Sequence, residues 1–101
     1  MKESTRKDRL PVVAGSFYPD DPEELRRTIA GFLSEAKKAS LQGLVRALVV
    51  PHAGYVFSGG VAASGYNQLD PEHSYRRVFI LASSHRVSLD NASVYTGGGY
   101  L

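Results

Sequence analysis

The chain has 101 residues, of which 43% are hydrophobic and 22% are charged, and it contains no cysteine. This composition is that of a globular domain with a single core. The absence of cysteine excludes disulfides and thiolate metal ligands within these residues. No apolar run reaches the roughly 20 residues of a membrane-spanning helix, and the start of the sequence lacks the apolar stretch of a secretory signal. These features favour a cytoplasmic protein with no membrane-embedded part.

The positive net charge is confined to the first residues of the chain. Residues 1–9 carry four of the 12 basic and two of the 10 acidic side chains, which leaves eight of each sign in residues 10–101. A nucleic-acid surface needs basic residues that are gathered on a folded face or interleaved with aromatic ones. We therefore predict a disordered polar arm over residues 1–9, a folded domain over residues 10–101, and no binding of nucleic acid.

The first predicted elements are an extended segment and a helix. Residues 10–18 (LPVVAGSFY) are apolar and contain proline and glycine, which favours extended, packed backbone. Asp21 can then serve as an N-cap, Pro22 suits the first helical position, and glutamates follow in the first turn. The sequence predicts a helix over residues 22–38. Its apolar residues share one face: Leu25, Ile29, Phe32, Leu33 and Ala36.

Two short apolar runs with a helical stretch between them define the predicted fold class. Residues 45–50 (VRALVV) and 77–82 (RVFILA) are typical of buried parallel strands, and residues 93–96 would begin a third strand. The stretch 60–69 predicts a helix that begins near Ser58 or Gly59. Strand, helix and strand form a βαβ unit, whose crossover is nearly always right-handed. The expected fold class is therefore α/β, with a mostly parallel sheet flanked by helices.

Two histidines follow the two predicted strands at similar distances. His52 lies two residues after the first strand and His85 three residues after the second. Neighbouring strands lie about 4.8 Å apart, and ligands of open α/β sheets bind beyond the carboxyl ends of the strands. Imidazole binds transition metals and also acts as a base near neutral pH. We therefore predict that His52 and His85 converge on one site, and that this site binds a metal.

A metal normally takes three or four protein ligands, and further ligands are poorly represented near these histidines. Asp90 could swing back toward His85, and Tyr55 could add a phenol. His73 is excluded, because it lies in a turn at the opposite edge of the predicted sheet. The alternative for each histidine is an ordinary structural role, since a lone histidine is usually a surface or core residue.

The sequence contains residues that could form two other kinds of site. A nucleophile at Ser83 or Ser84 is disfavoured, because no GxSxG motif surrounds these serines. An anion at a helix start formed by Ser58–Gly60 is a weaker hypothesis, since glycine pairs more often ease a turn. No GxGxxG or Walker motif is present.

Three strings of this sequence resemble the N-terminal third of the Memo family, whose prokaryotic members are also called AmmeMemoRadiSam system protein B. They occur in the family's order: VAGSFYP at 13–19, VVPHAGYVFSGGVAASGY at 49–66 and RRVFILASSHRVSLDNASVYTGGGYL at 76–101. The most specific part is PHAGY followed by a predicted strand that ends in SSH. Residues 10–101 thus look like part of a Memo domain.

The resemblance implies a fold similar to class III extradiol dioxygenases, which hold non-haem iron at the end of an α/β sheet. It also implies that His52 and His85 are metal ligands, with iron or copper as the metal and zinc as an alternative. Tyr55 and Ser84 would lie beside the metal, and a third ligand would come from later in the family's chain. An enzymatic role as a metal-dependent, dioxygenase-like oxidoreductase is implied by analogy alone.

The sequence departs from the family pattern in two respects. Arg86 stands where the family motif Pro-Ser-His-His has its second histidine, and a fixed cation there disfavours a divalent metal and favours an anionic substrate. Family members are also much longer than this chain. We therefore expect an incomplete metal site and an exposed sheet edge that promotes self-association. A non-catalytic module that binds a peptide or small anion through Arg86 and Ser58–Gly60, and an inactive fragment, remain as alternatives.

Overall fold

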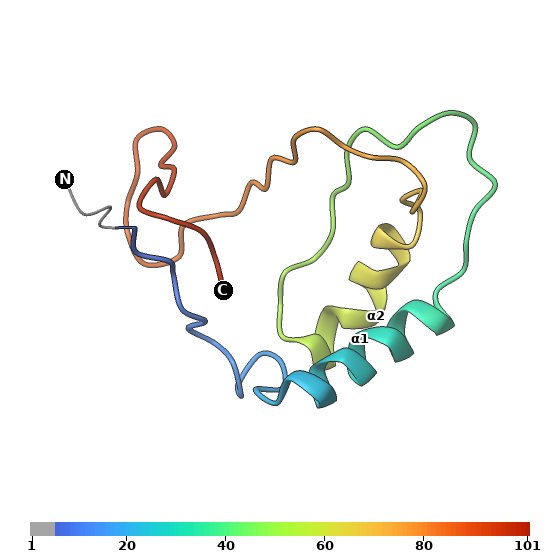
Figure 1. The fold of residues 1–101 in the computed structure, drawn as a ribbon, viewed down its shortest axis with the longest axis horizontal. Coiled ribbons are helices and arrows are strands. Elements are labelled where there is room, and N and C mark those ends of the chain that lie inside the picture. Colours follow the sequence, from blue (N-terminus) through green and yellow to red (C-terminus); the bar gives the residue numbers. More distant parts are fainter. Residues whose placement is uncertain (1–5) are drawn as a thin grey trace. The chain divides into compact units, whose positions relative to one another are not determined.

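The computed structural model describes residues 6–101 and contains two helices, α1 (Pro22–Glu35) and α2 (Tyr55–Tyr66) (Figure 1). The chain divides into two units. One is Val13–Ser74, which contains both helices, and the other combines Met1–Val12 with Tyr75–Leu101. Within residues 6–101, neither helix has the length and apolar character needed to cross a membrane.

Helix α1 begins where the sequence predicts. Asp21 is in an extended conformation, and its Oδ2 accepts a hydrogen bond of 2.8 Å from the N–H of Glu24. Pro22 occupies the first helical position, where its missing N–H costs nothing and its fixed φ suits the helix. Local chemistry is thus sufficient to explain this end of the helix.

The end of α1 lies three residues before the predicted residue 38, because contacts from far along the chain hold the next segment extended. Ala36 already has φ −71° and ψ 131°. The side-chain amide of Asn67 donates to the Ala36 carbonyl at 3.1 Å, and that of Gln68 donates to the Lys37 carbonyl at 2.9 Å. The predicted end is wrong: the backbone leaves the helical conformation at Ala36, and amides from beyond α2 bind the carbonyls of the segment that follows.

Helix α2 begins five residues before the predicted start at residue 60 and ends at Tyr66. Its N-cap is Gly54, which has no side chain to cap the helix. Instead, the Tyr55 N–H donates to the Phe17 carbonyl at 2.8 Å. The prediction that Ser58 or Gly59 caps this helix is wrong, since both residues lie inside it.

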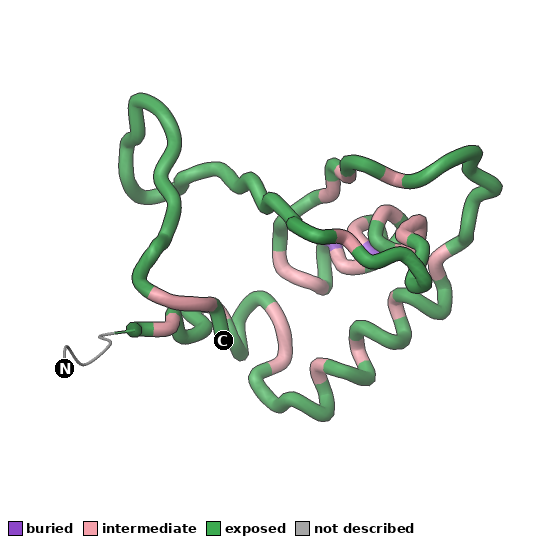
Figure 2. The backbone as a smooth tube through the Cα atoms, turned by 45° about the horizontal axis from the view of Figure 1, so that its top comes forward, coloured by how far each residue is buried: buried purple, intermediate pink, exposed green. Residues whose placement is uncertain are grey.

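The two helices pack against each other within one unit, through an aromatic ring on α1 and a glycine on α2. A Cβ atom added to Gly59 would lie 2.6 Å from Cε2 of Phe32, so only glycine permits this close approach. On another side of α2, a Cβ at Gly65 would lie 2.6 Å from Cγ1 of Val50. Among residues 6–101, Ala63 and Ser58 of α2 are the buried residues, at 6% and 7% exposure (Figure 2).

The apolar segment before α1 forms a turn rather than a continuous extended run. Gly15 has φ +84°, in the left-handed region that glycine adopts without strain. Its N–H donates to the Tyr18 carbonyl at 2.7 Å, and the Phe17 N–H donates to the Val13 carbonyl at 2.9 Å. This turn directs the Phe17 carbonyl to the start of α2.

The segments predicted as strands form no regular β-strand in residues 6–101, where β pairing is limited to the isolated bridges Arg9–Tyr100 and Ala14–Tyr18. Residues 45–50 belong to the helical unit, and residues 77–82 are exposed in the other unit. A strand is stabilised by pairing with a neighbour. The α/β fold and its parallel sheet therefore remain predictions.

The other unit is held by pairing between the two ends of the chain. The N–H groups of Lys7 and Arg9 donate to the carbonyls of Gly97 and Gly99 at 2.9 and 2.8 Å. The Arg9 guanidinium also lies 5.3 Å from the centre of the Tyr100 ring, within cation–π range. Residues 6–9 of the predicted arm thus take part in this pairing, whereas residues 1–5 lie outside the described residues.

Candidate metal site

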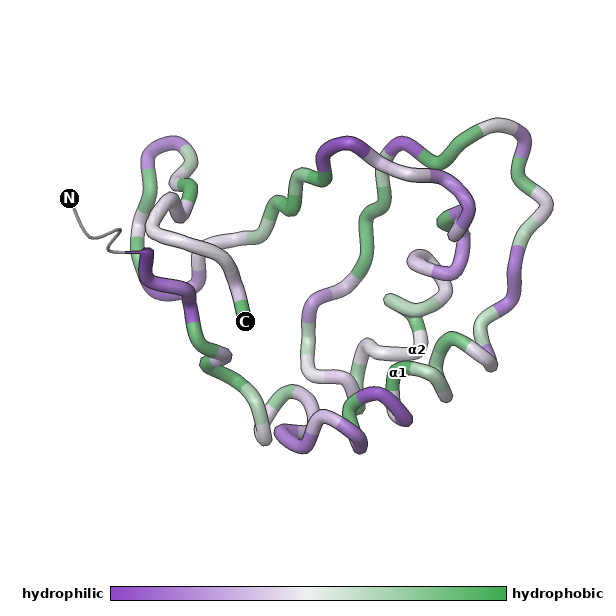
Figure 3. Tube along the Cα trace, in the orientation of Figure 1, coloured by the Kyte–Doolittle hydropathy of each residue, from purple (hydrophilic) through white to green (hydrophobic). Residues whose placement is uncertain are grey.

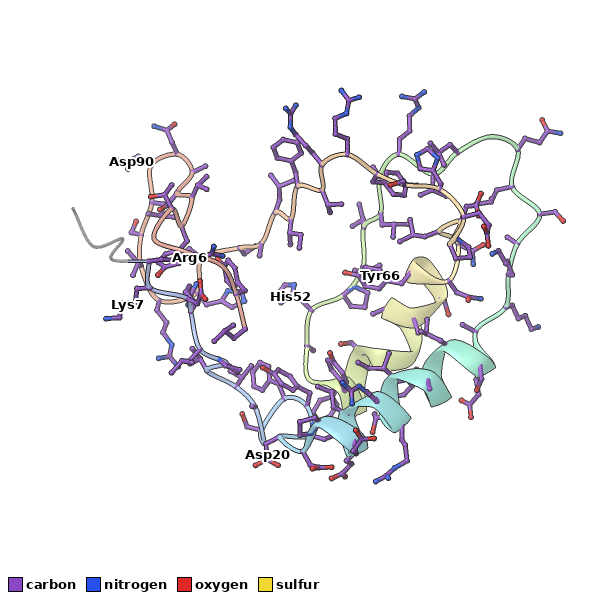
Figure 4. All side chains as sticks on the ribbon, in the orientation of Figure 1. Arg6, Lys7, Asp20, His52, Tyr66 and Asp90 are labelled. Atoms are coloured by element: carbon purple, nitrogen blue, oxygen red, sulfur yellow. The ribbon has the colours of Figure 1, made fainter. Side chains whose placement is uncertain are left out.

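His52 lies on the irregular segment that leads from residues 45–50 into α2 (Figure 4). It is exposed, and it is three residues before Tyr55, the first residue of the helix. Because α2 is anchored to Phe17 at its first N–H, the position of the segment that carries His52 is fixed on its helical side.

His85 lies in the other unit, in a bend that a neighbouring serine stabilises. The Ser84 hydroxyl donates to the Val87 carbonyl, which ties the residues on either side of His85 and Arg86 together. His85 and Arg86 are both exposed. This hydrogen bond commits the Ser84 proton to the backbone and leaves the hydroxyl oxygen as an acceptor.

The two histidines belong to different units, and each unit is described by itself, so their convergence remains a prediction. No group of three or more His, Cys, Asp or Glu residues within 6–101 is arranged to hold a metal ion. Two imidazoles have the right donor chemistry for iron, copper or zinc. Their number does not fit a complete site, so a full ligand set needs at least one further donor.

Tyr55 belongs to an aromatic cluster in the helical unit, formed by Tyr18, Phe32 and Tyr55. The Tyr55 ring centre lies 5.6 Å from that of Tyr18, with the planes tilted by 40°, and 6.5 Å from that of Phe32, in an edge-on arrangement. These are favourable geometries for aromatic pairs. The half-buried ring therefore joins α2 to α1 and to the turn before α1, which gives this tyrosine of the PHAGY string a positioning role.

The hypothesis of an anion site at Ser58–Gly60 is wrong, because these residues are not at a helix start. The Ser58 hydroxyl donates to the Ala53 carbonyl at 2.8 Å. At the real start of α2, the N–H groups of Tyr55 and Phe57 bind the Phe17 and Gly54 carbonyls. These donors are thus already engaged by the protein backbone.

The remaining candidates, His73 and Asp90, belong to different units. The His73 N–H donates to the Asp70 carbonyl at 3.1 Å, in the turn after α2, and Asp90 is an exposed residue of the unit that contains His85. Sequence reasoning missed Phe17 and Tyr18, which position the PHAGY segment. Both belong to the apolar string VAGSFYP, whose paired aromatic residues are the signal that could have indicated a packing role.

Comparison with known proteins identifies the family of the chain. The family model described as "Memo-like protein" matches residues 9–100. Protein MEMO1 of Danio rerio is 43% identical over 81 residues, which cover 80% of this chain and 26% of that protein. Human Protein MEMO1 is 40% identical over 81 residues, with the same coverage of 80% and 26%. No solved structure matches the chain.

A MEMO1 family protein of Sulfolobus acidocaldarius is 44% identical over 87 residues, which cover 76% of this chain and 31% of that protein. The chain therefore belongs to the Memo-like protein family. It spans between a quarter and a third of the length of these curated relatives. His52 and His85 both lie within the matched residues.

Proposed function

We propose that this chain carries part of a metal site in which His52 and His85 are two of the ligands, with iron or copper as the metal and zinc as the alternative. The observation that carries the proposal is family membership over residues 9–100, a range that contains both the PHAGY and the SSH strings. Each string supplies one exposed imidazole.

Side chains near the two histidines hold the segments that carry them in place. The Tyr55 ring fixes the end of the segment that carries His52, through Tyr18 and Phe32. The Ser84 hydroxyl fixes the bend that carries His85. Arg86 would attract an anionic substrate or peptide to the same place. Bound iron or copper would supply redox chemistry, including the dioxygenase-like oxidoreductase activity that the resemblance implies.

Metal binding by this chain alone is expected to be weak. The described residues contain no group of three ligands, and the relatives continue well beyond the matched segment. A donor from that further segment would complete the site, as metals of this type take three or four protein ligands.

The test is a titration of the chain with Fe(II), Cu(II) and Zn(II), followed by isothermal calorimetry or metal-specific absorbance. We expect His52→Ala and His85→Ala each to weaken binding by about tenfold or more, with His73→Ala as the matched control that leaves it unchanged. If both histidines bind one ion, the double variant will lose less than the sum of the single losses. Equal losses in all three variants, or additive losses, would contradict a shared site.

The alternative function is a non-catalytic module that binds a peptide or small anion. One observation favours it: the exposed Arg86 replaces a histidine of the family motif. Binding of phosphate or an acidic peptide that is lost in Arg86→Ala, but kept in His52→Ala and His85→Ala, would support this module instead of the metal site.

A further inference from the structure

Helix α2 buries one hydroxyl group. Among residues 6–101, Ser58 is the polar residue that is buried, at 7% exposure. Over its 12 residues α2 contains no charged side chain, whereas α1 carries several (Figure 3). A buried hydroxyl has lost its hydrogen bonds to water, so burial is costly unless the protein supplies a partner. The partner of Ser58 therefore indicates what its hydroxyl does.

The Ser58 hydroxyl binds outside its own helix. A serine within a helix can donate to the carbonyl four residues earlier, and Ser64 of the same helix does so, to Gly60 at 3.1 Å. Ser58 makes its shorter hydrogen bond to the carbonyl of Ala53, five residues earlier, at 2.8 Å. Ala53 precedes the helix and directly follows His52. The hydroxyl thus holds the segment that carries this histidine.

The next peptide group toward the helix is held as well. The Gly54 carbonyl accepts a hydrogen bond of 3.0 Å from the Ser58 N–H, and the Tyr55 N–H donates to the Phe17 carbonyl at 2.8 Å. The Gly54 carbonyl and the Tyr55 N–H belong to the same peptide group. Together with the hydroxyl bond, these contacts fix two successive peptide groups. One further peptide group then separates this fixed backbone from His52.

We propose that Ser58 is a positioning residue for His52, whose buried hydroxyl sets the direction in which the backbone presents the imidazole. This inference rests on the proposed metal site. Alanine, which occupies the nearby positions 62 and 63 of α2, would fill the same space with better helix propensity. The hydroxyl therefore serves its hydrogen bond rather than the packing of the helix. An imidazole held in one orientation loses less conformational entropy when it binds a metal.

The first test follows the backbone in the absence of metal. NMR relaxation of the backbone amides compares Ser58→Ala with the matched control Ser64→Ala, which removes a hydroxyl that binds within α2. In Ser58→Ala the order parameters of the Ala53 and Gly54 N–H groups should fall from about 0.85 to about 0.6 or below. They should stay unchanged in Ser64→Ala, and the helical circular dichroism should be retained in both variants, because alanine favours a helix.

Ser58→Thr keeps a hydroxyl at this position and should restore most of the backbone order. Unchanged order parameters in Ser58→Ala, or an equal decrease in Ser64→Ala, would overturn the proposal. A loss of order that threonine does not restore would also overturn it, because the hydroxyl would then not be the group responsible.

The second test asks whether Ser58 acts through His52. Ser58→Ala should weaken the binding of Cu(II) by about tenfold, Ser64→Ala should leave it unchanged, and Ser58→Thr should recover most of the loss. In a chain that already carries His52→Ala, Ser58→Ala should cause no further loss, since the two residues act as a unit. A further loss in that background would overturn the proposal, because the hydroxyl would then act on another part of the protein.

The two tests separate a failure of this inference from a failure of the metal site. If His52→Ala leaves Cu(II) binding unchanged, the metal site is wrong, and the order parameters still decide whether Ser58 holds the segment before α2. If His52→Ala weakens binding but Ser58→Ala does not, the metal site stands and the positioning role of Ser58 is overturned.

Discussion

The two helices of this protein differ in how their boundaries are set. Helix α1 contains its own start residues, with the Asp21 side chain bound to the Glu24 N–H and Pro22 in the first position. Helix α2 has a glycine N-cap without a side chain, and its first N–H binds the carbonyl of Phe17, 38 residues away. Local sequence therefore determines where α1 begins, whereas tertiary contacts determine where α2 begins.

Removal of the contact between the two helices should have the largest effect on the free energy of unfolding. Phe32→Ala removes the ring that packs on Gly59 and Tyr55 and should lower the free energy of unfolding by about 2–3 kcal/mol, less than for a fully buried ring because Phe32 is half-buried. Phe57→Ala, the matched control at an exposed phenylalanine of α2, should cost less than about 0.5 kcal/mol. Urea denaturation followed by circular dichroism at 222 nm measures both. Equal losses would mean that the helices do not depend on this contact.

Substitutions of two adjacent glycines of α2 should change the free energy of unfolding by smaller amounts and in opposite directions. In Gly59→Ala the new Cβ would lie within 2.6–3.1 Å of three ring atoms of Phe32, and the crowding should cost about 1–2 kcal/mol. In Gly60→Ala the nearest such atom is 3.9 Å away, so the better helix propensity of alanine should stabilise the chain by up to about 1 kcal/mol. The sign of the difference is measured by the same urea denaturation. A stabilised Gly59→Ala would contradict the close approach of the helices.

The fold could be predicted from sequence only where local chemistry determines it. The cap and proline at the start of α1 were sufficient to place that boundary. The end of α1 and the start of α2 could not be predicted. They depend on the hydrogen bond that the Asn67 amide donates to the Ala36 carbonyl and on the one that the Phe17 carbonyl accepts from the Tyr55 N–H. In both, the partners are about 30 residues or more apart in the chain. The amide residues directly after α2 would have been a reasonable hint of such a contact.

The candidate site could be predicted only as a set of residues. The spacing of His52 and His85 after two apolar runs, and the PHAGY and SSH strings, selected the same two histidines. Their convergence depends on pairing between residues 45–50 and 77–82, which belong to different units. Sequence pattern identifies a segment that favours a strand, but its partner depends on the rest of the sheet. The anion hypothesis failed for a related reason, since the boundary of α2 was misplaced by five residues.

The smallest expected effect concerns the feature that distinguishes α1, its side-chain cap. Asp21→Ala removes the acceptor for the Glu24 N–H and should lower the free energy of unfolding by about 1 kcal/mol. The loss should appear as faster amide exchange in the first turn of α1. The start of α2 should be affected less, because its first N–H binds the Phe17 carbonyl. Asp21→Asn keeps an acceptor at this position and should recover most of the loss. If Asp21→Ala accelerated exchange equally at both helix starts, α1 would depend on tertiary contacts as much as α2 does.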